Sequence, residues 1–310
     1  MTYSNRIYGA ALIKAINSNY NADFSGQPRT LPNGVVYATD KALKYAIKNF
    51  IKENYPFEKV FYFKRFNEEF IPYSLDDAFV AAFPEHEDEK DKKIIAKDLL
   101  SCIDIRLFGA TFAKKAKNNN VAISIHGPVQ ITHGINVWHE NNFYSEQIMS
   151  PFRNPNEKNE DNTATTLGRQ SRLHEGHYLH HFSVNPKNLE EILELAGNDA
   201  NTLKDDDISK LKEALQKGVT YYDSAAKVGC ENELLVWVTL KPESKLVMPN
   251  FTQLMKMSKE KVDGKVQLDM SELKKVVDVN KNEIEAFEIY LNNASIIIAN
   301  APDEAIIKNL

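Results

Sequence analysis

Residues 6–52, RIYGAALIKAINSNYNADFSGQPRTLPNGVVYATDKALKYAIKNFIK, decide the fold. The almost unbroken apolar run over residues 6–16 predicts a buried strand. A loop rich in Asn, Gly, Asp and Pro follows over residues 17–33, and these residue types favour turns. A second extended stretch then leads to Thr39 or Asp40, either of which can cap a helix. The order of strand, long loop and helix predicts the first part of a β-α-β fold.

The expected helix, which runs to about residue 54, carries a basic stripe. At 100° per residue, Lys41, Lys44, Lys48 and Lys52 lie within about 80° of one another, and apolar side chains fill the opposite face. Between Lys41 and Lys52, no Asp or Glu on the basic face provides the usual i,i+4 partner. Ammonium groups attract phosphate without reading bases, so the stripe can follow a nucleic-acid backbone. The simpler alternative is a solvated charged face.

The stripe stands out because the whole chain is acidic, with a formal net charge of −5. Residues 1–65 nevertheless hold ten Lys or Arg against four Asp or Glu. This balance excludes a protein that coats nucleic acid through bulk positive charge, but it allows a local phosphate-binding edge. The two cysteines, Cys102 and Cys230, lack metal-type spacing. No apolar run reaches the ~20 residues of a membrane span and no secretion signal is evident, so we expect a cytoplasmic protein.

The whole chain has 310 residues, which is enough for one large domain or two smaller ones. The part that follows residue 52 alternates strands and helices. Strands are expected over residues 59–65, 121–125, 173–184 and 233–240, and helices over residues 98–116, broken at Gly109, and 206–226. A short helix and one or two strands, or a second helix, are expected over residues 272–299. Residues 145–170 predict a projecting hairpin with a polar tip, 154–166, that we expect to be mobile. This order fits a ferredoxin-like, RNA-recognition-motif-like body with large insertions.

Eight histidines raise the question of a metal site. They include two groups, His126, His133 and His139 in one, and His174, His177, His180 and His181 in the other. His174 and His177 are three residues apart in an expected strand, which sends them to opposite faces and differs from the helical HExxH zinc motif. Packing is favoured for these histidines, ahead of contacts with nucleotides and of zinc binding. No nucleophile elbow is present, and Asp23 is a lone loop carboxylate of the kind that usually forms a turn.

Six motifs together resemble one protein family. They are NSNYNADFSGQPR at residues 17–29, GVVYATDKALKYAIKNF at 34–50, DIRLFG at 104–109, GPVQ at 127–130, LGR at 167–169 and HFSVNP at 181–186. Their order and spacing resemble the backbone subunit of type I CRISPR interference complexes, closest to the type I-B branch, over roughly residues 5–240. The resemblance implies an α+β fold of the RAMP superfamily: a modified RNA-recognition-motif (ferredoxin-like) palm with a helical fingers insertion and a thumb hairpin.

The resemblance also implies a division of the chain. The first half of the palm is expected over residues 1–65, the fingers insertion over 66–125, a palm or finger strand over 126–143, the thumb hairpin over 144–172, and the second half of the palm with a C-terminal extension over 173–310. Tyr20 and Ala22 stand where Pro and Gly are common in the family, which is a departure within the first loop.

The function implied by the resemblance is that of a non-catalytic subunit that binds CRISPR RNA and polymerises along it. Its partners would be other copies of itself, other Cascade subunits and, through the guide, target DNA, with no cofactor, no metal and no membrane. The RNA-binding candidates are Lys41, Lys44, Lys48, Asn21, Asp23, Arg29, Thr39, Arg106, Gln130, Arg153 and Arg169. Ile148, Met149 and Phe152 of the thumb are candidates for wedging between bases. One alternative is a RAMP-type endoribonuclease that cleaves bound RNA through Asp23 or a histidine within residues 174–181, and another is a metal-dependent hydrolase built on the histidines.

Overall fold

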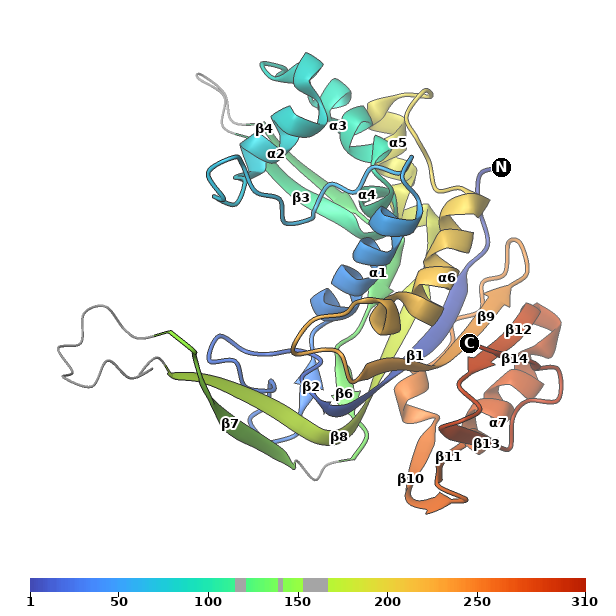
Figure 1. Ribbon diagram of the computed structural model, residues 1–310. Coiled ribbons are helices and arrows are strands. Elements are labelled where there is room, and N and C mark those ends of the chain that lie inside the picture. Colours follow the sequence, from blue (N-terminus) through green and yellow to red (C-terminus); the bar gives the residue numbers. More distant parts are fainter. Residues whose placement is uncertain (115–120, 139–141, 153–166) are drawn as a thin grey trace, which may run out of the picture.

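The computed structural model describes residues 1–114, 121–138, 142–152 and 167–310. Figure 1 shows a body built on a long twisted sheet, an upper lobe of short helices, and a hairpin that projects away from the body. Arg153, His139 and the polar tip at residues 154–166 lie outside the described residues. Within the described ranges, no helix is long and apolar enough to cross a membrane.

The main sheet is organised around β1 (Ile7–Ser18), which lies between β8 (Leu167–Val184) and β9 (Cys230–Leu240) and is antiparallel to both. The strand order across the sheet is β14 (Ile306–Asn309), β12 (Ile284–Leu291), β9, β1, β8, β6 (Gly134–Asn136) and β2 (Tyr37–Ala38). Two further strands, β5 (Val129–Ile131) and β7 (Phe143–Met149), also pair with β8. The strands predicted within residues 6–16, 173–184 and 233–240 are confirmed.

β1 is apolar almost throughout because both of its faces are buried. Alternate residues such as Ile7 and Ala11 belong to one core, while Tyr8 and Leu12 belong to a second core on the opposite face. The first core is covered by α1 (Asp40–Asn54) and α6 (Asp205–Tyr221), which pack against each other. The second is covered by a C-terminal layer, so the sheet is the middle of a sandwich.

The C-terminal layer contains α7 (Ser271–Asn280) and a small sheet of β10 (Lys256–Val262), β11 (Lys265–Asp269) and β13 (Ile296–Ala299). The upper lobe contains α2 (Leu75–Ala82), α3 (Lys92–Ser101), α4 (Ile103–Phe108), α5 (Glu190–Ala196) and the antiparallel pair β3 (Gly109–Lys114) and β4 (Val121–His126). Single 3-10 turns cover Pro84–His86, Pro186–Leu189, Phe251–Gln253 and Lys281–Glu283.

One predicted element is wrong, and another is right only as far as Gly109. Residues 59–65 do not form a strand, because the backbone N–H groups of Phe61 and Tyr62 donate to the Asp104 carboxylate, each at 2.8 Å, instead of to a neighbouring strand. The expected helix at residues 98–116 does break at Gly109, whose φ is 73°, but it continues as strand β3. Burial alternates from residue to residue there, with Thr111 exposed and Phe112 buried, and this period of two is typical of a strand and not of a helix.

Candidate nucleic-acid interface

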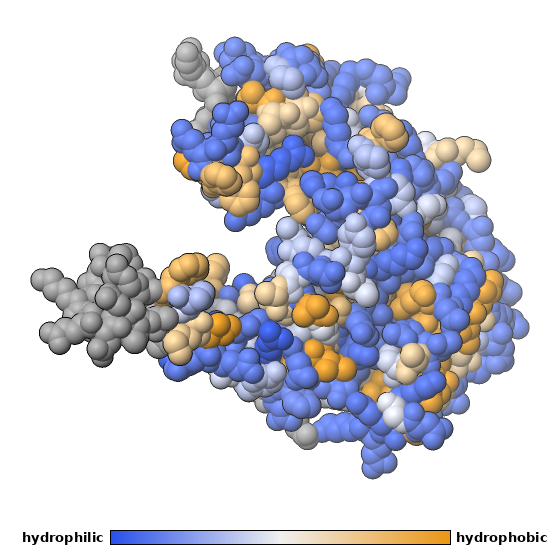
Figure 2. Space-filling model, in the orientation of Figure 1, coloured by the Kyte–Doolittle hydropathy of each residue, from blue (hydrophilic) through white to orange (hydrophobic). Residues whose placement is uncertain are grey.

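A groove of about 540 Å³ lies between α1 and the upper lobe. Its lining includes Lys41, Lys44 and Lys48 from α1, and Gln130 from β5. Four of the predicted RNA-binding residues are therefore brought together, although Gln130 lies more than 80 positions along the chain from the lysines. Figure 2 shows that the molecule is hollowed between the upper lobe and the projecting hairpin, and in Figure 1 α1 lies between these two parts.

The lysine stripe has an acidic partner that the sequence analysis did not consider. Asp40, one residue before the stripe begins, lies 3.0 Å from the Lys41 ammonium and 3.2 Å from that of Lys44. Burial would raise the pKa of Asp40, but the hydrogen bonds and charges of these two lysines bring it below its ordinary value. Lys52 also pairs with an acid, the neighbouring Glu53, at 2.5 Å. The interval from Lys41 to Lys52 is free of acids, as the sequence analysis stated, but an acid that flanks it at each end forms an ion pair with the stripe.

Lys48 is held against the groove wall and is not a solvated side chain. Its Nζ donates to the Tyr62 carbonyl at 2.6 Å, and burial lowers its pKa although the nearby charge of Asp104 opposes this shift. Asp104 is itself buried, which raises its pKa in spite of the two backbone hydrogen bonds from Phe61 and Tyr62. A cation that is partly desolvated in this way interacts more strongly with an anion that enters the groove than a fully solvated cation would.

Two glycines form the back of the groove. A Cβ on Gly109 would lie 2.2 Å from the Ile125 carbonyl oxygen, and one on Gly127 would lie 2.1 Å from the Phe108 carbonyl carbon. Only glycine fits at both points, so the backbones of α4, β3 and β4 approach closely there. Beside them, Gln130 donates to the Gly127 carbonyl at 2.8 Å. This packing explains why DIRLFG and GPVQ occur as motifs far apart in the sequence.

The loop after β1 is fastened to the start of α1. Asn21 Oδ1 accepts hydrogen bonds from the backbone N–H and the hydroxyl of Thr39, at 2.9 and 3.0 Å. Arg29 donates through Nε to the Ala22 carbonyl at 3.1 Å. Asp23 Oδ1 accepts from the backbone N–H groups of Ser25 and Gln27, so that this carboxylate forms a turn. These residues shape the loop, and none of them lines the groove.

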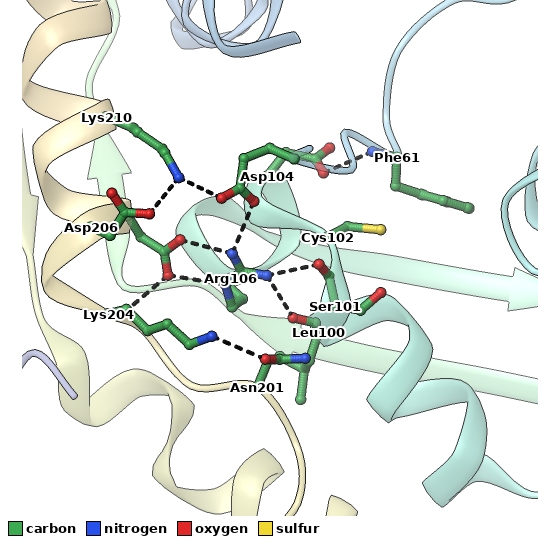
Figure 3. Close-up of polar contacts among 12 residues, drawn as sticks. Phe61, Leu100, Ser101, Cys102, Asp104, Arg106, Asn201, Lys204, Asp206 and Lys210 are labelled. Atoms are coloured by element: carbon green, nitrogen blue, oxygen red, sulfur yellow. Dashed lines mark hydrogen bonds and ion pairs between the residues drawn. The ribbon is translucent and has the colours of Figure 1, made fainter. Parts of the chain in front are cut away.

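Arg106 does not lie at a surface. Its guanidinium forms two hydrogen bonds with the Asp207 carboxylate of α6, at 3.0 and 2.7 Å, and donates to the carbonyls of Leu100 and Ser101. Figure 3 shows Arg106 beside Leu100 and Ser101. Only 4% of Arg106 is exposed, so the expected RNA contact is wrong for this residue. Arg106 instead joins the upper lobe to the body.

The remaining candidates lie on the projecting hairpin. Arg169 of β8 is exposed and pairs in register with Gln147 of β7. Ile148, Met149 and Phe152 are 46%, 65% and 75% exposed, as side chains that wedge between bases would have to be. Ile148 and Met149 are successive strand residues, however, so they point to opposite faces of the hairpin.

Two buried histidines of β8 have structural partners. His177 is fully buried and its Nδ1 lies 2.6 Å from the Glu233 carboxylate. His180 is also buried, with its Nδ1 2.9 Å from the Thr132 carbonyl, and burial lowers its pKa to about 4. Among the described residues, no cluster of three or more His, Cys, Asp or Glu side chains is arranged to hold a metal ion. The favoured role of these histidines in packing is confirmed for His177 and His180.

Several residues of the groove were missed by the sequence analysis. They are Tyr62, Asp104, Phe108, Thr111, Ser124 and His126. The sequence groups His126 with the other histidines, for which packing is favoured ahead of contacts with nucleotides and of zinc binding. Asp104 and Phe108 lie in the DIRLFG motif, but no spacing in the sequence places them beside the lysines, and Tyr62, Thr111 and Ser124 lie in none of the six motifs. These residues meet only when β3 and β4 fold against α1.

Comparisons with known proteins identify the family and the fold. The family model described as "CRISPR-associated protein Cas7" matches residues 5–287. Among solved structures, the chain is similar to one from a "CRISPR RNA-guided surveillance complex, pre-nicking", with a TM-score of 0.55, 12% identity, and coverage of 98% of this chain and 96% of that chain. A chain of a "CRISPR RNA-guided surveillance complex" gives a TM-score of 0.50, 13% identity, and coverage of 97% and 94%. No curated protein matches the sequence. At these identities the solved structures are alike in fold.

Proposed function

Because the chain belongs to the Cas7 family of CRISPR-associated proteins, we propose that it is a backbone subunit of a Cascade-type surveillance complex and binds CRISPR RNA. Several copies assemble side by side along one guide, together with other Cascade subunits, in the cytoplasm. The guide then pairs with target DNA. The motif order between residues 17 and 186 supports a type I-B-like branch.

We assign the parts of the hand-like family architecture to particular elements. We assign the palm to a ferredoxin-like unit. Its strands lie in the order β9, β1, β8 and then β5 or β6, which is the order of two interleaved β-α-β units, and α1 and α6 cover one face. The fingers correspond to α2, α3, α4, β3 and β4 of the upper lobe, and the thumb to the β7 and β8 hairpin. The domain boundaries expected from the sequence remain our proposal for this division.

The observation that carries the proposal is the groove between α1 and the upper lobe. Lys41, Lys44 and Lys48 line it from one helix face, and Gln130 and the backbone of Gly109 and Gly127 are among the groups that line the other side. Lysines interact with phosphate as point charges and do not distinguish bases. A subunit that must hold a guide of variable sequence needs this kind of contact, while base pairing reads the target, as in other RNA-guided systems.

We propose no cleavage reaction. Asp23, the candidate for an endoribonuclease, is occupied by the turn of its own loop, and hydrogen bonding from Ser25 lowers its pKa. A carboxylate with a lowered pKa is a poor proton acceptor at neutral pH. Residues 66–310 hold 28 Lys or Arg against 39 Asp or Glu, and this negative charge also disfavours binding to nucleic acid away from the groove.

The test is guide-RNA binding by Lys44→Ala/Lys48→Ala protein over a range of salt concentrations. We expect the double variant to bind guide RNA more weakly than wild type. The slope of log affinity against log salt concentration should also become shallower, by about 0.7 for each phosphate of single-stranded RNA that a lysine no longer neutralises. Lys275→Ala is the matched control, because Lys275 is an exposed lysine of α7, 71% exposed, and lies outside the groove. Thermal unfolding checks that the double variant is folded. Binding equal to wild type at moderate salt would show that the groove does not hold RNA.

A further inference from the structure

One exposed loop of the upper lobe has no role in the function proposed above. Residues 66–72, FNEEFIP, connect the first part of the chain to α2. Three large apolar side chains gather on this loop: Phe66, Phe70 and Ile71 are 50%, 85% and 54% exposed. Several exposed large apolar side chains within a few residues commonly mark an interaction site.

The loop is held in a defined shape that displays Phe70. Asn67 Oδ1 accepts hydrogen bonds from the backbone N–H groups of Glu69 and Ile71, at 3.0 and 2.9 Å. Phe70 has a φ of 61°, in the left-handed region that bulky residues rarely adopt. Backbone strain of this kind clusters at functional positions, where the surrounding structure maintains it. The loop therefore holds a strained backbone conformation in which an aromatic ring is presented to solvent.

An apolar groove of matching character lies elsewhere on the same lobe. It has a volume of about 350 Å³ and runs between α3, β4 and α5. Its lining includes Ala96, Ile123, Ile192 and Leu195, and Leu195 is 59% exposed. In Figure 1, α5 and the segment that leads into α2 lie on opposite sides of the upper lobe. A loop on one side and a groove on the other can form a repeating head-to-tail contact.

The charges around the two features are complementary. The loop carries Glu68 and Glu69, both exposed, next to Phe70. The groove is lined on its α3 side by Lys92 and Lys93, which are also exposed and make no ion pair within the described part of the chain. We infer that residues 66–72 of one copy of this protein dock into the α3, β4 and α5 groove of a second copy. This inference rests on the proposed function, because that function places copies next to one another on RNA.

Cysteine cross-linking on RNA tests the contact directly. Phe70→Cys protein and Leu195→Cys protein are mixed on a guide RNA long enough for several copies and treated with a short bismaleimide. The natural cysteines, Cys102 and Cys230, are buried and can stay in place. We expect a cross-linked dimer that contains one copy of each variant. Val279→Cys replaces Leu195→Cys as the matched control, since Val279 is 83% exposed on α7 and should give no product.

Charge reversal provides a second measurement. Glu69→Lys in the loop variant should reduce the yield of cross-linked dimer about tenfold, because it places like charges together across the contact. Lys93→Glu in the groove variant should restore the yield. Light scattering on the same samples reports whether copies assemble on RNA. Assembly without cross-linking above the Val279 control overturns the docking inference and leaves the proposed function intact, whereas failure to bind RNA overturns both.

Discussion

Arg106 and Asp207 form a buried ion pair that joins the upper lobe to α6, and both side chains are at most 5% exposed. Removing one partner of such a pair leaves an uncompensated buried charge, which typically destabilises a protein by about 3–5 kcal/mol. We therefore expect Arg106→Ala to lower the free energy of unfolding by about this amount, measured by urea denaturation. Arg169→Ala, at an exposed strand position, should change it by less than about 0.5 kcal/mol. If Arg106→Ala protein were as stable as wild type but bound RNA more weakly, Arg106 would be a residue that contacts RNA.

His180 makes stability depend on pH. Burial lowers its pKa from 6.5 to about 4, so the unfolded chain binds a proton over a pH range in which the folded chain does not. Its contribution to stability is complete above pH 6.5 and is lost as the pH falls from 6.5 to about 4. Unfolding measured across this range should show a smaller loss for His180→Gln than for wild type. Parallel curves for the two proteins would contradict the assignment.

The sequence predicts the position and the partners of some residues of the site but not of others. Lys44 and Lys48 follow from helical spacing, because the apolar face of α1 fixes which way the basic face points. The partner of Arg106 could not be found in this way, since Asp207 lies 101 positions further along the chain. Asp40 was within reach: it is an acid four residues before Lys44, which is the ordinary spacing of a helical ion pair.

At the scale of elements, strong patterns predicted the right structures and weak ones did not. β1 and α1 were predicted because long apolar or amphipathic runs leave one arrangement that buries them. Residues 59–65 alternate like a strand, but the carboxylate of Asp104 takes up their N–H groups, and no local pattern reports a side chain more than 40 residues away. Strand β3 was missed because its alternation covers only Gly109–Lys114, directly after a helix.

The β7 and β8 hairpin leads to a prediction about which side chain enters the guide–target duplex. Met149 shares a strand face with Ser145 and Phe143, whose partners across the hairpin, Ser171 and Leu173, are buried. Leu173 belongs to the core that α1 covers, so this is the face directed toward the α1 side of the sheet. We expect Met149 to be the wedge.

The measurement is fluorescence of 2-aminopurine placed along the guide or target in the assembled complex, where unstacked positions are bright. Met149→Ala should lower the signal at the interrupted positions, because an apolar wedge is what keeps bases unstacked. Ile148→Ala, one residue away on the opposite face, is the matched control and should leave the signal unchanged. Equal effects of the two substitutions would contradict a single wedge.

At the scale of the whole molecule, the C-terminal layer is more than the extension that the sequence analysis described. It supplies Phe251, Leu268 and Leu273, all buried, to the second core. The sequence places these residues beyond the last motif of the resemblance, in short elements with modest periodicity. Both faces of β1 are apolar, so the main sheet needs a covering layer on each side. The C-terminal residues supply the layer on the far side.

Truncation tests this dependence. Removal of residues 245–310 should expose Tyr8, Leu12, Val236 and Val238, which are otherwise 4% exposed or less. An apolar sheet face of this size in water favours association, so we expect the truncated chain to aggregate in size-exclusion chromatography. Removal of residues 306–310 alone takes away β14, whose residues are all exposed, and should leave a soluble chain. A monodisperse, folded protein after the larger truncation would mean that the palm needs only one covering layer, which the continuous apolar run of β1 argues against.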